Sequence, residues 1–240
     1  MDESVADLIA ALDSADAGEA EEAQALLIAK GHRDDVLLAL IAAIPDFGRF
    51  GQLCGIEVFI SIGDSRAGDT LVKMLRSEDE TVRQWAANAV GELNVRGAVP
   101  ELMHAYEQVK QRGTPLDWTE PEAIRTALTA LGARPIVLPS RAAALAREEG
   151  PFSRCWDAGD LHEVLRELVN ANQLILYFQH WAPWGDTYTW KSTPGWDLPW
   201  DLPWSELVSA SGTAALHSAR LAGIARGVVA TVSWMDQSDR

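Results

Sequence analysis

Residues 80–102 read ETVRQWAANAVGELNVRGAVPEL, and this stretch decides the predicted fold of the first half of the chain. Its apolar residues recur every three or four positions between Glu80 and Leu93, a spacing that places them on one face of a helix. A short polar turn follows. Pro100 then stands just inside a second helix, where its missing N–H costs nothing. The stretch therefore predicts two helices joined by a turn.

A similar stretch lies earlier in the chain. Residues 60–75 (ISIGDSRAGDTLVKML) align with residues 91–106 at an offset of 31 positions, so that Ile62 falls on Leu93. This offset fits one helix–turn–helix unit. A weaker third copy is expected from residue 124 onward, with a second helix that Pro139 interrupts. Further amphipathic helices are predicted upstream, over residues 4–12, 19–30 and 34–44.

Residues 80–102 also carry a family motif. It consists of Val82-Arg83, two alanines, G-x-L at 91–93 and A-x-P-x-L at 98–102; residues 55–75 carry a variant with Asp69 at the proline position. Over about residues 50–135 the chain thereby resembles HEAT-like repeat proteins of the short type named after phycobilisome lyases. The resemblance implies a solenoid of helical hairpins with a concave binding face, and it implies no reaction.

The repeat period is lost after residue 139, and Gly150-Pro151 marks the predicted boundary between a domain over 1–149 and a domain over 150–240. Beyond residue 139 the pattern first predicts helices over 141–149 and 160–171. Strands over 173–181 and 187–192 are then expected to form a hairpin, followed by a proline-rich loop over 192–204. The last predicted elements are a helix from 204 to 225, broken near 211–212, and a strand over 226–236. The predicted fold class is α+β, mainly α: a helical-hairpin solenoid followed by a small three-stranded α+β unit.

Tryptophan is concentrated in the second half. Eight of the ten tryptophans lie between Trp156 and Trp234, and the segment WDLPWDLPW repeats itself. Two interpretations are open. The rings either fill the core of a small sheet or form a recognition surface, because tryptophan is enriched where proteins bind one another. The candidate partner-binding residues of this loop are Trp196, Asp197, Trp200, Asp201 and Trp204.

The acidic run Glu78-Asp79-Glu80 also has two interpretations. Acids are favoured at the N-terminal end of a helix, where they stabilise the helix dipole. The same three side chains could instead form a patch that binds a partner, and we include them among the candidate partner-binding residues.

Charge and composition narrow the function classes. The net charge is −15, and residues 1–140 hold 23 acidic and 12 basic side chains. No basic patch is present for a phosphate backbone, so we expect no nucleic-acid partner. No apolar run is long enough for a membrane span, and the acidic N-terminus does not resemble a secretory signal, which predicts a cytoplasmic protein. The two cysteines are far apart, which predicts buried free thiols rather than a disulfide.

The sequence carries no catalytic or cofactor motif. The five histidines show no metal-ligand spacing, and the nucleophile-elbow, dinucleotide and phosphate-loop patterns are missing. Asp197 and Asp201 stand between tryptophans, as acids do at sugar sites, but the motif is short. We therefore expect no catalytic residue, no metal and no cofactor.

These observations predict a protein-binding adaptor or inhibitor with a basic protein partner, which includes the possibility of an immunity-type protein that neutralises a toxin. Two alternatives stay open. One is an enzyme resembling the bilin lyases that share the repeat type, and the other is binding of a small ligand by the tryptophan-rich domain. The oligomeric state is not predicted.

Overall fold

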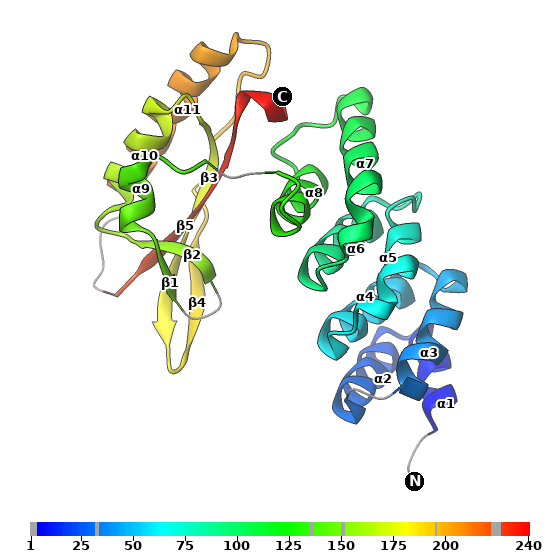
Figure 1. Ribbon diagram of the computed structural model, residues 1–240. Helices are drawn as coiled ribbons and strands as arrows, with labels where there is room; N and C mark the ends of the chain where they lie inside the picture. Colours follow the sequence, from blue (N-terminus) through cyan, green and yellow to red (C-terminus); the bar gives the residue numbers. More distant parts are fainter. Residues whose placement is uncertain (1–3, 32–33, 135–136, 150–151, 195, 222–226) are drawn as a thin grey trace. The chain divides into compact units, whose positions relative to one another are not determined.

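The computed structural model describes residues 4–31, 34–134, 137–149, 152–194, 196–221 and 227–240 (Figure 1). The fold is α+β and mainly helical, as predicted. The chain divides between residues 136 and 137 into two compact units, which are described separately. Within the described ranges, no helix is long and apolar enough to cross a membrane.

The first unit consists of helices. They are α1 (Val5–Ala11), α2 (Ala17–Lys30), α3 (Asp34–Ala43), α4 (Arg49–Ile62), α5 (Gly68–Met74), α6 (Glu80–Glu92), α7 (Val99–Arg112) and α8 (Thr119–Ala130), with 3-10 turns at Ile44–Asp46, Ser65–Ala67 and Arg96–Ala98. The predicted helices over 4–12, 19–30, 34–44 and 80–93 are confirmed. The second helix of the third copy was predicted to begin over residues 134–138. Residues 135–136 lie outside the described residues, and 134 and 137–139 are not helical.

The helices of the first unit succeed one another in packed pairs (Figure 1). Helix α2 contacts α4, α4 contacts α6, and α6 contacts α8, while α5 packs against α6 and α7 against α8. Gly91 permits the close approach of α6 and α8, because a Cβ at this position would lie 3.0 Å from the Cα of Ala127. Glycine at Gly63 and Gly113 ends α4 and α7 in the left-handed conformation.

The second unit holds a sheet covered by helices. Its strands are β1 (Arg147–Glu149), β2 (Phe152–Asp157), β3 (Leu174–Trp184), β4 (Thr187–Ser192) and β5 (Val229–Met235), and its helices are α9 (Ser140–Leu145), α10 (Leu161–Asn170), α11 (Trp204–Leu221) and a final 3-10 turn, Gln237–Asp239. The strands are antiparallel in the order β1-β2-β5-β3-β4. The predicted helix over 160–171, the β3–β4 hairpin and the last strand are confirmed.

The prediction of three strands is wrong, because the described sheet has five. The two unpredicted strands are short. Strand β1 has three charged residues without apolar alternation, and β2 follows the Gly150-Pro151 dipeptide. The predicted helix over 141–149 is replaced by α9 and β1. Both of these elements are part of the second unit, which begins at residue 137, whereas the predicted boundary lay at 149–150.

Helix α11 is continuous through residues 211–212, where a break was predicted. Gly212 lies against α10, and a Cβ there would come within 2.5 Å of the Val169 side chain. The glycine therefore serves a close helix–helix contact rather than a break. The neighbouring Ser211 hydroxyl is also satisfied, because it donates to the carbonyl oxygen of Ile175 in β3.

Helices α9, α10 and α11 lie on one side of the sheet, and the core of the second unit forms between them (Figure 1). Trp156 is fully buried in this core and donates from Nε1 to the carbonyl oxygen of Ala142 at 2.8 Å. Its ring meets Trp234 edge to face at 6.3 Å. By contrast, the side chains of Trp184 and Trp190 on the β3–β4 hairpin are exposed. The tryptophans thus divide between core and surface.

Candidate functional site

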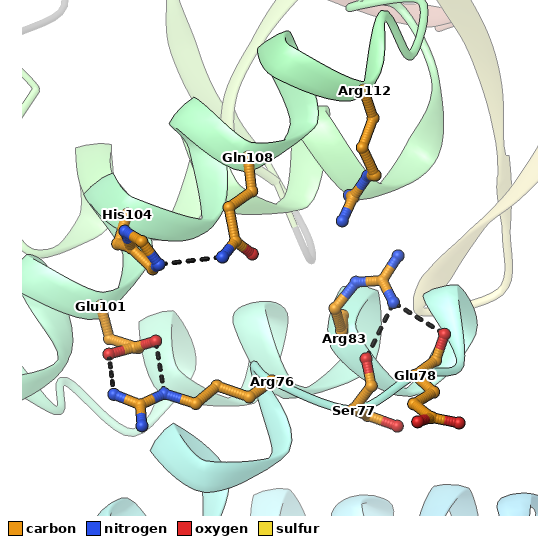
Figure 2. Close-up of a pocket in the computed structure, with 8 residues that line it drawn as sticks. All are labelled: Arg76, Ser77, Glu78, Arg83, Glu101, His104, Gln108 and Arg112. Carbon is orange, nitrogen blue, oxygen red and sulfur yellow. Dashed lines mark hydrogen bonds and ion pairs between the residues drawn. The ribbon is translucent and has the colours of Figure 1, made fainter.

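The first unit contains a polar hollow of about 530 Å³ (Figure 2). We call it the α7 hollow. It is lined by Arg76, Ser77, Glu78, Arg83, Glu101, His104, Gln108 and Arg112. The first three residues come from the α5–α6 connection, and the last four lie on one face of α7 because they are three or four positions apart. The opposite face of α7 is buried in the unit.

A buried carboxylate supports one wall of the hollow. Glu120 in the first turn of α8 is only 1% exposed, and it accepts hydrogen bonds from two arginines. Arg83 approaches it with Nε at 2.5 Å and Nη2 at 3.0 Å, and Arg112 approaches it with Nη2 at 3.0 Å. The hydrogen bond to Glu120 raises the pKa of Arg83. The guanidinium group of Arg83 is therefore held in its charged form.

Arg83 also fixes the α5–α6 connection. Its Nη1 donates to the carbonyl oxygens of Ser77 at 2.8 Å and Glu78 at 2.9 Å (Figure 2). Its side chain is largely buried, whereas the bond to Glu78 lies at the surface. One guanidinium group thus joins three segments of the unit: α6, the connection before it, and α8. The backbone at the edge of the hollow is held in place before any partner arrives.

A second ion pair crosses the hollow closer to solvent. Arg76 donates from Nε and Nη2 to the two carboxylate oxygens of Glu101, at 2.7 and 2.6 Å. This hydrogen bonding lowers the pKa of Glu101 and raises that of Arg76. Because the Arg76 side chain is 72% exposed, water and salt screen the pair and its contribution to stability is small. It serves mainly to orient the two side chains.

The remaining lining residues offer hydrogen-bonding groups. The His104 ring nitrogen Nε2 and the Gln108 Nε2 are 2.9 Å apart on the exposed face of α7. The Ser77 hydroxyl oxygen accepts from the backbone N–H of Asp79. The hollow pairs no nucleophile with a base, and no group of three or more metal-binding side chains occurs anywhere in the described residues. The groups that it presents are charged and hydrogen-bonding side chains.

The structure separates the three predicted acidic residues by role. Glu78 is exposed and lines the α7 hollow. Asp79 caps α6 by accepting from the backbone N–H groups of Thr81 and Val82, and it also pairs with Arg49 at 3.3 Å. Glu80 stands in the first turn of α6. The second and third residues thus build the helix start, and the first lines the hollow; partner binding by the run stays a prediction.

The tryptophan-rich loop belongs to the second unit, and its rings are mostly engaged there. The Trp196 ring packs against the core at 6.0 Å from Phe178. Trp204 is 6% exposed and donates from Nε1 to the carbonyl oxygen of Asn172. Trp200 is half-buried, and its carbonyl oxygen accepts from Arg240 at 2.7 Å. In this loop the exposed candidates are the carboxylates of Asp197 and Asp201.

Sequence reasoning missed most of the hollow. Arg76, Arg83, Glu101, His104, Gln108 and Arg112 were not among the candidates, and neither was Glu120. The spacing of the polar residues along α7 was readable, but it is common to every exposed helix face. The pairing of Arg83 with Glu120 spans 37 positions and leaves no local signal.

No protein-family model matches the chain, and no curated protein matches its sequence.

A buried histidine is expected to make the second unit sensitive to acid. His180 in β3 is 6% exposed, lies edge to face against Phe178, and contacts the Ser192 hydroxyl at 3.3 Å through Nδ1. Burial lowers its pKa. As the pH falls through about 6.5, the unfolded chain therefore binds a proton that the folded chain does not, and stability is lost.

We expect His180→Gln to reduce this acid sensitivity. The limit for one proton is about 1.4 kcal/mol per pH unit. Urea unfolding at pH 7.5, 6.5 and 5.5, followed by tryptophan fluorescence, measures the slope of stability against pH. His162, whose pKa is also lowered by burial, supplies the comparison as His162→Gln, because its side chain is less enclosed. An unchanged slope in His180→Gln would show that His180 is not the sensor.

Proposed function

We propose that this chain is a protein-binding adaptor or inhibitor, and that the α7 hollow is part of its contact surface. The observation that carries the proposal is the fixed arrangement of the hollow. Arg76, Arg83 and Glu101 are already held by hydrogen bonds in the free protein. Side chains that are ordered before binding lose less entropy when a partner docks, which favours affinity and specificity.

The helix packing supports this proposal. In our interpretation α4–α5, α6–α7 and α8 belong to HEAT-like hairpins, in which α2, α4, α6 and α8 form one row through their successive contacts. The second helices of such hairpins line the concave side of a solenoid, where these scaffolds hold their partners. The hollow is built on the second helix α7 and on the connection that follows α5, which is the expected place for a partner.

The charge of the first unit favours a basic partner. Residues 1–140 carry a formal charge of −11, and Glu78 adds an exposed carboxylate at the hollow. A field of this sign speeds the encounter with a basic protein and weakens as salt increases. An immunity-type inhibitor of a basic toxin is one such protein. The two cysteines are free and buried, which suits the reducing cytoplasm that we propose as its location.

Affinity capture from the host lysate, at low and high salt and with mass spectrometry, tests the proposal. We expect one stoichiometric basic partner that is lost as salt rises. Glu78→Lys is expected to weaken capture at least about tenfold, because it reverses a charge at the hollow. The matched control is Glu22→Lys, which changes the net charge equally on exposed α2. Absence of a partner at both salt concentrations, or equal capture by both variants, would contradict the proposal.

A further inference from the structure

Arg112 differs from the other arginines of the hollow because only one of its nitrogens is engaged. Its Nη2 donates to both oxygens of Glu120, at 3.1 and 3.0 Å. Its Nε and Nη1 make no hydrogen bond within the described residues. The guanidinium group points from α7 into the hollow toward Arg83 (Figure 2). A flat cation is thus anchored at one corner and keeps two nitrogens with donors for a ligand.

The charge of the wall is also unbalanced. Arg83 and Arg112 share the single carboxylate of Glu120, so this cluster carries a formal charge of +1. Glu120 is buried, and its oxygens already accept four hydrogen bonds. It therefore cannot contact a ligand. The other pair of the hollow, Arg76 with Glu101, is balanced one to one.

The surrounding groups select the ligand. Gln108 lies one turn before Arg112 on the same face of α7, and it offers a side-chain amide. Exposed Glu78 also lines the hollow, and its negative charge disfavours multiply charged anions. A singly charged, flat oxyanion fits this balance best, since a carboxylate can bond two guanidinium N–H groups side by side.

We propose that the α7 hollow contains a carboxylate-binding site at Arg112, with Gln108 as a second contact. The inference deepens the proposed function: the group bound would be an acidic side chain or the C-terminal carboxylate of the protein partner. A basic partner is attracted by the whole unit at long range, and its one inserted carboxylate is recognised at short range. The site thereby fixes the orientation of the partner rather than the rate of encounter.

The test uses the full chain and small anions as probes, so it needs no partner. Side-chain Nε–H signals of the arginines are followed by NMR while acetate, and separately inorganic phosphate, is added at constant ionic strength. We expect a saturable shift of the Arg112 signal with acetate in the millimolar range. The side-chain amide signal of Gln108 should shift with it, and Arg112→Gln should abolish this shift. Arg112→Lys should weaken the affinity for acetate about tenfold, because the planar guanidinium fork is lost.

Arg96→Gln is the matched control, because Arg96 is an exposed arginine of the same unit outside the hollow. Acetate binding should be unchanged in it. The site would be overturned if the signals of all arginines shifted linearly with acetate, or if the Gln108 shift still saturated in Arg112→Gln. Saturable binding of phosphate but not of acetate would overturn the assignment of the site to carboxylates. Acetate binding without a captured partner would refute only the proposed function, whereas capture of a partner without acetate binding would refute only the site.

Discussion

Replacing Trp156 by alanine is expected to lower the free energy of unfolding of the second unit by about 3–5 kcal/mol, the range for a large aromatic ring removed from a core. The ring is fully buried between β5 and the helices, and it touches Trp234. Its loss leaves a cavity that the sheet cannot close. The substitution also removes the hydrogen bond that the indole N–H of Trp156 donates to the Ala142 carbonyl oxygen.

Urea unfolding followed by far-ultraviolet circular dichroism measures this loss. Trp184→Ala is the matched control, because its ring is 71% exposed and the same atoms are removed. We expect that control to stay within about 0.5 kcal/mol of the wild type. Two variants with similar midpoints would contradict the placement of Trp156 in the core. A loss confined to Trp156→Ala would show that burial decides the role of each ring.

The sequence predicts those elements whose periodicity is strong and local. Helix α10 was predicted because it has a clear apolar face. Strands β3 and β4 were predicted as a pair because they are rich in aromatic residues and are joined by a short turn. Strand β2 was missed because its pairing is distant: Trp156 lies opposite Ala230 in β5. Such a pairing is specified by tertiary packing, and without an adjacent turn it leaves no local signal in the sequence of β2.

The candidate site shows the same limit. Glu78 was found because an acidic run attracts notice before a helix. The arginines were not found, because an arginine in a sequence does not reveal whether it meets a carboxylate or solvent. Arg83 and Arg96 are both arginines of the first unit, yet one is buried against Glu120 and the other is exposed. Only the packing of α8 on α6 distinguishes them.

The second large effect is expected for Glu120→Ala in the first unit. Removing the carboxylate leaves Arg83 buried without a counter-charge, which costs about 3–5 kcal/mol when one partner of a buried pair is lost. Arg112 is half-exposed and can turn to solvent, so Arg83 carries most of the penalty. The change is measured by urea unfolding with circular dichroism at 222 nm, where the helical first unit dominates the signal.

Glu101→Ala is the control, because it removes an equal carboxylate from an exposed arginine, and we expect little change in stability. Equal effects of the two variants would mean that Arg83 reaches water in the folded protein. The double variant Glu120→Leu with Arg83→Met separates charge from position: burying two apolar side chains can restore stability. It cannot restore the bonds from Arg83 to the Ser77 and Glu78 carbonyl oxygens, nor the anchor of Arg112. A stable double variant that no longer binds acetate would therefore show that the buried cluster is kept for the hollow rather than for the fold.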